Sequence, residues 1–196
     1  MAANDTERSG TGRLRADAAR NRERVLAAAE RLFSSVDPRQ VTMEDIARAA
    51  GVGRATLYRR FATPAAVALA LLDEHERRLQ DEIIRGAPPL GPGAPPSERL
   101  AAFYAAMVDM LERHLHLALG GETGSARFHT GAYGFWRLHV RTLLTSSGVP
   151  EVDAMIDVLL APLAPDVYHY QRHELDLTQE QVTAALGTLA RRVLGQ

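Results

Sequence analysis

Apolar residues recur every three or four positions along most of the chain, which is the period of an amphipathic α-helix. In the first such segment, 15–35, Val25, Ala29, Leu32 and Phe33 share one face. The same period predicts further helices over 42–50, 54–61, 64–85, 98–117, 131–146, 151–161 and 178–194. No alternating strand pattern and no internal repeat accompanies them. The pattern therefore predicts an all-α protein.

Short polar residues and glycine mark where several of these helices begin and end. Thr42 is followed three positions later by Asp45, and Thr178 by Gln181, which is the spacing of a capping box. Gly51 stands where the second helix should end, since glycine adopts the left-handed conformation without a steric penalty. Thr42 and Gly51 thus mark the beginning and the end of a short second helix.

The pattern divides the chain into five parts. We predict a disordered polar arm over 1–14, a three-helix unit over 15–62, a connecting helix over 63–85 and a larger helical bundle over 98–196. Residues 86–97 hold five of the ten prolines and are predicted to form a stiff exposed loop. We interpret this loop as a connection rather than as a recognition motif.

Composition and charge narrow the possible functions. The chain is 46% apolar and 24% charged and has no cysteine, which excludes disulfides and thiolate metal sites. It has no apolar run of the roughly 20 residues that a membrane span needs, so we expect a soluble, cytoplasmic protein. Residues 1–61 carry 12 Arg and 8 acidic residues, whereas 62–196 carry 11 Arg and 16 acidic residues. Unless this asymmetry is chance clustering, the basic end suggests a polyanionic partner.

The most informative stretch is residues 42–61, TMEDIARAAGVGRATLYRRF. Two short helices joined by a turn that contains glycine are typical of a helix-turn-helix, whose second helix enters the major groove of DNA. With Leu57 and Phe61 turned inward, Ala55 and Arg59 point outward. Arginine can bind guanine edges or phosphates, and threonine and tyrosine hydroxyls can bind phosphates. The candidate DNA-contacting residues are Thr42, Arg54, Ala55, Thr56, Tyr58, Arg59 and Arg60.

This stretch closely resembles the TetR family of repressors. The matching residues are Ala28, Ala29, Leu32, Phe33, Thr42, Ile46, Ala47, Ala50, Gly51, Val52, Thr56, Leu57, Tyr58 and Phe61, followed by the long helix from Pro64. The resemblance implies an all-α homodimer that binds an operator, expected to be an inverted repeat, through its N-terminal helices. It also implies that a small molecule bound in the C-terminal domain releases the repressor from DNA.

Aromatic and methionine side chains of the C-terminal bundle are the candidates for an effector pocket. Helical bundles place apolar pockets between their helices, with a few polar groups that orient the ligand. Plain core packing is the rival interpretation of every one of these residues. The candidates are Phe103, Tyr104, Met107, His114, Phe128, Tyr133, Trp136 and His139.

Other functions find less support in the sequence. No phosphate-binding loop, nucleophile elbow or paired metal-binding motif is present, so we expect neither an enzyme nor a cofactor. His114, His116 and His129 could suggest a metal site. Because His114 and His116 are two positions apart, they would lie on different helix faces, and a metal site is therefore an unfavoured alternative. A DNA-binding factor without a small-molecule ligand remains the main alternative to a ligand-gated repressor.

Overall fold

The computed structural model describes residues 3–35, 40–121, 128 and 130–195, without the side chains of 3–16, 116 and 119–121. Within this part of the chain every regular element is helical, which confirms the predicted all-α class. His129 and the side chain of His116 lie outside the description. None of the described helices is both long and apolar enough to cross a membrane.

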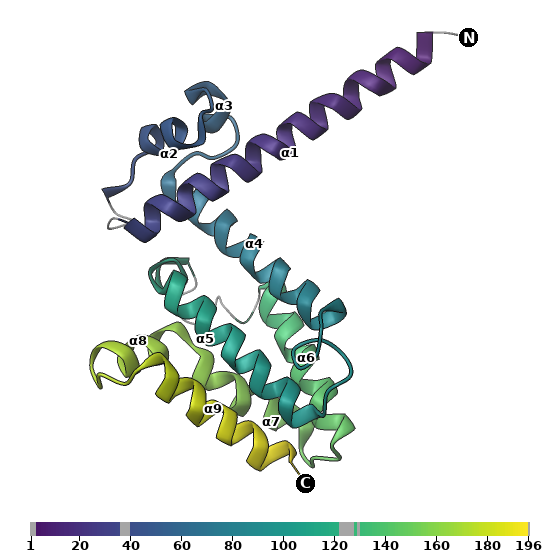
Figure 1. Ribbon diagram of the computed structural model, residues 1–196, viewed down its shortest axis with the longest axis vertical. Helices are drawn as coiled ribbons and strands as arrows, with labels where there is room; N and C mark the ends of the chain where they lie inside the picture. Colours follow the sequence, from purple (N-terminus) through teal and green to yellow (C-terminus); the bar gives the residue numbers. More distant parts are fainter. Residues whose placement is uncertain (1–2, 36–39, 122–127, 129, 196) are drawn as a thin grey trace. The chain divides into compact units, whose positions relative to one another are not determined.

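The helices form two compact units, Met1–Leu71 and Leu72–Gln196. The helices run in the following order: α1 Ala3–Ser35, α2 Met43–Ala50, α3 Arg54–Tyr58, α4 Pro64–Arg85, α5 Pro96–Gly121, α6 Gly131–Ser146, α7 Val152–Leu160, the 3₁₀ helix Ala161–Leu163, α8 Pro165–His173 and α9 Gln179–Leu194 (Figure 1). The first unit contains α1, α2, α3 and the beginning of α4. The second contains the rest of α4 and all later helices.

In the first unit, α2 packs on α1 and α3 packs on α2. Their shared core consists of fully or almost fully buried apolar side chains, among them Val25, Ala29, Ile46 and Leu57. The buried positions of α1 and α2 are those of the predicted apolar stripes. Burial of this core supplies the main stabilising term for α2 and α3, which are too short to be stable alone.

In the second unit, α5 packs along α9 and also contacts α6 and α8, while α6 packs along α7 (Figure 1). The longest helix of this unit, α5, therefore contacts most of the others. Its backbone departs from helical geometry at His114, where φ is −130° and ψ is 19°. The helix is therefore interrupted near its last third, and the side chains on either side of His114 change direction.

Several predicted boundaries differ from the structure. Helix α1 begins at Ala3, so the arm predicted to be disordered over 1–14 is helical from its third residue; no proline in this segment stops the helix. Helix α5 begins at Pro96, inside the predicted loop 86–97, because proline is tolerated in the first turn of a helix. Helix α3 ends at Tyr58 rather than at residue 61.

Candidate nucleic-acid interface and apolar cavity

Both ends of α2 are capped by residues that the sequence predicts, Thr42 and Gly51. The Thr42 hydroxyl accepts a hydrogen bond from the Asp45 N–H (3.2 Å), and the Asp45 carboxylate accepts one from the Thr42 N–H (3.2 Å). The Thr42 hydroxyl also donates to the Asp45 carboxylate, and this bond, together with the bond from the Thr42 N–H, lowers the pKa of Asp45. Gly51 ends α2 with φ of 61°, and its carbonyl accepts a hydrogen bond from Arg24 Nη2 (2.9 Å). Because Thr42 is used in this cap, a DNA phosphate would compete with Asp45 for its hydroxyl.

Helix α3 presents one buried and one exposed face. Leu57 is buried, with 1% of its surface exposed, and Thr56 is half-buried. Ala55 and Arg59 are exposed to solvent, as is Tyr58, which is 49% exposed. Among the described residues, the side chains of Tyr58 and Arg59 make no hydrogen bond or ion pair. Both polar groups are therefore available to an external partner.

The two arginines at the ends of α3 are held by the protein itself. Arg54 forms an ion pair with Glu44 of α2. Arg60 Nη1 donates a hydrogen bond to the Ala18 carbonyl of α1 (3.1 Å). Both are exposed to solvent, but they also anchor α3 against its neighbours. Arg59 is thus the arginine of α3 that can move most freely toward a ligand.

A groove of about 430 Å³ runs between α1 and α3 in the first unit. Its walls include Thr56, Arg59 and Arg60 from the predicted set, together with Asn21 and Arg22 of α1. No residue of α1 was among the predicted DNA contacts, although five arginines lie within residues 13–24. That local density of positive charge was the available signal for a contribution from α1.

A mainly apolar cavity of about 600 Å³ lies within the second unit. The side chains that line it come from α4, α5, the residues just before α6, α6 itself, α7 and the segment after α7. They are Leu72, Glu76, Met107, Met110, Leu111, Ala118, Phe128, Thr130, Tyr133, Trp136, Arg137, Asp157, Leu160, Ala161, Leu163, Ala164 and Pro165. Residues from both sides of the interruption at His114 reach the cavity, so the break in α5 helps to shape it.

The structure brings together four of the eight residues predicted to border a pocket. Met107, Phe128, Tyr133 and Trp136 line the cavity. Among them, the rings of Phe128 and Tyr133 meet edge to face, with centroids 5.1 Å apart. Trp136 is only 4% exposed, so its indole reports on the interior of the second unit.

The other four lie elsewhere, which corrects the predicted outline of the pocket. Phe103 and Tyr104 are fully buried, and the Tyr104 hydroxyl donates to the Leu159 carbonyl (2.9 Å). His139 packs edge-on against Phe103, and burial lowers its pKa to about 4. His114 stacks on His75, with ring centroids 4.3 Å apart. Their helical spacing could not distinguish the core face of α5 or α6 from the face that borders the cavity.

One edge of the cavity is polar and involves residues that the sequence analysis did not single out. Arg137 of α6 forms an ion pair with Asp157 of α7, and the Tyr133 hydroxyl donates to Asp157 Oδ1 (2.9 Å). The hydrogen bond from Arg137 lowers the pKa of Asp157, while burial and the bond to Asp157 raise that of Tyr133. The cluster is therefore an ion pair joined by a neutral phenol.

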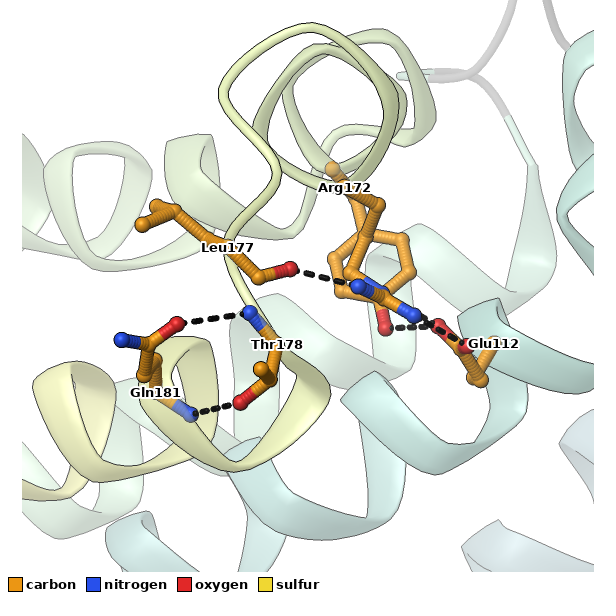
Figure 2. A network of polar contacts seen from close by, with 6 residues as sticks. Glu112, Arg172, Leu177, Thr178 and Gln181 are labelled. Carbon is orange, nitrogen blue, oxygen red and sulfur yellow. Dashed lines mark hydrogen bonds and ion pairs between the residues drawn. The ribbon is translucent and has the colours of Figure 1, made fainter.

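A second polar cluster fastens α8 and the start of α9 to α5 (Figure 2). Arg172 binds both carboxylate oxygens of Glu112 (2.9 and 2.8 Å) and also donates to the Leu177 carbonyl. The buried Tyr168 donates its hydroxyl to Glu112, whose pKa falls to about 2, chiefly through the hydrogen bond from Arg172. Next to it, Thr178 and Gln181 form the capping box of α9 (Figure 2). The cluster therefore connects α5 to α8 and to the start of α9, with Glu112 and Arg172 separated by 60 residues in the sequence.

The helix-turn-helix segment matches a known protein family. Residues 25–71 match the family model for the bacterial regulatory proteins of the tetR family. The matched segment contains α2, α3 and the buried face of α1. This segment therefore belongs to the TetR type of helix-turn-helix domain.

Two related proteins agree with the helix-turn-helix assignment. HTH-type transcriptional regulators from two strains of Mycobacterium tuberculosis are 48% identical to this chain over 62 residues. That match covers 32% of the chain and 31% of each relative, so it spans about a third of the length of these relatives.

Solved structures resemble the chain over most of its length. The fatty acid degradation regulator FadR from Bacillus halodurans has a TM-score of 0.63 at 17% identity, covering 86% of this chain and 93% of FadR. SmeT, solved in complex with triclosan, has a TM-score of 0.61 at 13% identity, covering 88% and 90%. A TetR-like transcriptional regulator from Rhodococcus sp. RHA1 has a TM-score of 0.60 at 16% identity, covering 90% and 97%. The TetR fold therefore extends through the C-terminal unit, where the sequences have diverged.

Proposed function

We propose that this chain is a cytoplasmic transcriptional repressor that binds operator DNA through α3 and is released by a small molecule. The observation that carries the proposal is the exposed face of α3, which presents Thr56, Tyr58 and Arg59 within a matched TetR-family segment. Arg59 can pair with a guanine edge or a phosphate, and the Tyr58 hydroxyl can reach a phosphate. The family match favours regulation over catalysis.

Loss of Arg59 or Tyr58 side chains should weaken operator binding without unfolding the first unit. Arg59→Ala and Tyr58→Ala are each expected to lose about 1–3 kcal/mol of binding free energy if they make specific contacts. If Arg59 reads a base, Arg59→Ala should also relax sequence preference. If it binds a phosphate, all sequences should weaken alike and the salt dependence should become shallower.

Gel shifts on the DNA that flanks the gene would measure these losses. Arg85→Ala, which removes an exposed arginine at the far end of α4, is the matched control and should bind as the wild type does. If the wild-type protein prefers no site there over random DNA at moderate salt, the repressor proposal is wrong.

We propose that the operator-binding form is a homodimer. One five-residue recognition helix contacts few base pairs, whereas a two-fold pair can read an inverted repeat. The candidate contact between subunits is on the C-terminal helices, where α9 carries Ala185, Leu189 and Val193. Ala185 is exposed, but Leu189 and Val193 are partly buried against the core of their own unit. Helix α8 adds exposed apolar side chains, Val167 (38%) and Tyr170 (47%), that extend the candidate surface.

Light scattering at micromolar concentration should return twice the 21.4 kDa of one chain. Tyr170→Glu would place charges against each other across a two-fold axis and should shift the mass toward the monomer. Glu174→Gln, an exposed change next to α8, is the control and should leave the mass unchanged. A monomeric mass for the wild-type protein would contradict the proposal.

The cavity supports a ligand-gated repressor over a DNA-binding factor that has no ligand. A volume of about 600 Å³ lies within the range of small-molecule sites, and most of its wall is apolar. A ligand would act by binding the DNA-free form more tightly than the DNA-bound form, because equal affinity for both shifts nothing. A thermal-shift screen of small molecules separates the alternatives, since a factor without a ligand should show no stabilisation.

A further inference from the structure

The charged side chains that line the cavity are all engaged within the protein. Arg137 and Asp157 neutralise each other in an ion pair, and the Tyr133 hydroxyl adds a hydrogen bond to the same carboxylate. Glu76, on the α4 side, also takes part in a polar or electrostatic interaction. At the Tyr133–Arg137–Asp157 edge, therefore, no unbalanced charge awaits a counter-charge on a ligand.

Hydrogen-bonding capacity nevertheless remains at the polar edge. The phenol oxygen of Tyr133 donates to Asp157 and can still accept a hydrogen bond. The guanidinium of Arg137 has five N–H donors, and the ion pair does not use them all. The Thr130 hydroxyl, which also lines the cavity, accepts a hydrogen bond from the Tyr133 N–H (3.2 Å). A hydroxyl, amide or phenol could join this network without opening the ion pair.

We propose that the cavity selects a neutral amphipathic ligand, with an apolar body against the methionine, leucine and aromatic wall and one uncharged polar group at the Tyr133–Arg137–Asp157 edge. This inference rests on the proposed ligand-gated function and names the chemical class of the effector. A carboxylate ligand that joined this network would add a negative charge beside a pair that is already neutralised, and an ammonium ligand would add a positive one. At the edge of an apolar cavity, an added charge without a counter-charge costs free energy.

Three probes with the same ten-carbon chain test the charge preference: decanol, decanoate and decyltrimethylammonium, each below its micelle-forming concentration. Quenching or shift of Trp136 emission reports binding, because Trp136 lines the cavity and is the only tryptophan in the chain. Decanol should bind about tenfold more tightly than either charged probe. The proposal is overturned if decanol binds no better than the charged probes, or if none of the three perturbs Trp136.

Two variants should switch the preference if the ion pair causes it. Asp157→Asn leaves Arg137 without a counter-charge and should tighten decanoate about tenfold, while Arg137→Gln should do the same for decyltrimethylammonium. Asp153→Asn is the matched control, because Asp153 pairs with Arg141 across the same two helices but does not line the cavity. Equal effects of Asp157→Asn and Asp153→Asn would also overturn the proposal.

The binding assay contains no DNA, so it can fail or succeed independently of the repressor proposal. Melting curves followed by circular dichroism show whether each variant is folded before its affinity is compared. If decanol binds as expected but leaves operator affinity unchanged, the ligand class stands and the gating function does not.

Discussion

Leu57→Ala is expected to destabilise the first unit by about 2–5 kcal/mol and to abolish operator binding. Leu57 is 1% exposed and is the buried side chain of α3. Truncation removes apolar contacts and leaves a cavity that a five-residue helix cannot close by shifting, since its ends are tied to Glu44 and Ala18. A loss of this size is a large part of the roughly 5–15 kcal/mol that stabilises a typical domain.

Thermal melting and gel shifts would measure this effect together. Leu69→Ala is the matched control, because Leu69 belongs to the same unit but is 45% exposed, and should change stability by no more than about 0.5 kcal/mol. Trp136 emission, which comes from the second unit, should keep its own transition. Wild-type stability and operator affinity in Leu57→Ala would show that the buried face of α3 has been assigned wrongly.

Tyr168→Ala is expected to destabilise the second unit by about 3–5 kcal/mol, the range for truncating a large buried aromatic side chain. Tyr168 is fully buried on α8, and its hydroxyl donates to Glu112 of α5. The substitution removes both the ring and this bond, leaving Arg172 as the side chain that holds the carboxylate of Glu112.

Tyr168→Phe separates the two contributions, because it keeps the ring and deletes only the hydroxyl. It should lose about 1.5–3 kcal/mol, the range for a hydrogen bond to a charged group. Urea denaturation followed by Trp136 emission would compare the two variants in the same unit. If Tyr168→Phe proved as unstable as Tyr168→Ala, the hydroxyl rather than the packed ring would hold α8.

The helices and several of their ends follow from local sequence. The capping boxes begun by Thr42 and Thr178, and the left-handed Gly51, involve residues within four positions of one another. Hydrophobic period and capping are short-range effects, so they can be recognised without knowledge of the neighbours. The exposed face of α3 could be predicted for the same reason, because burying Leu57 leaves Arg59 outside.

The cavity depended instead on contacts between helices. Phe103 and Trp136 look alike in the sequence, yet one is fully buried in the core and the other lines the cavity. The rotation of each helix about its axis decides which apolar side chain meets a neighbour and which meets the cavity. The interruption of α5 at His114 and the pairing of Arg137 with Asp157, twenty residues away, arise only when the bundle is assembled. Periodicity identifies an apolar face, but only packing between helices determines what that face contacts.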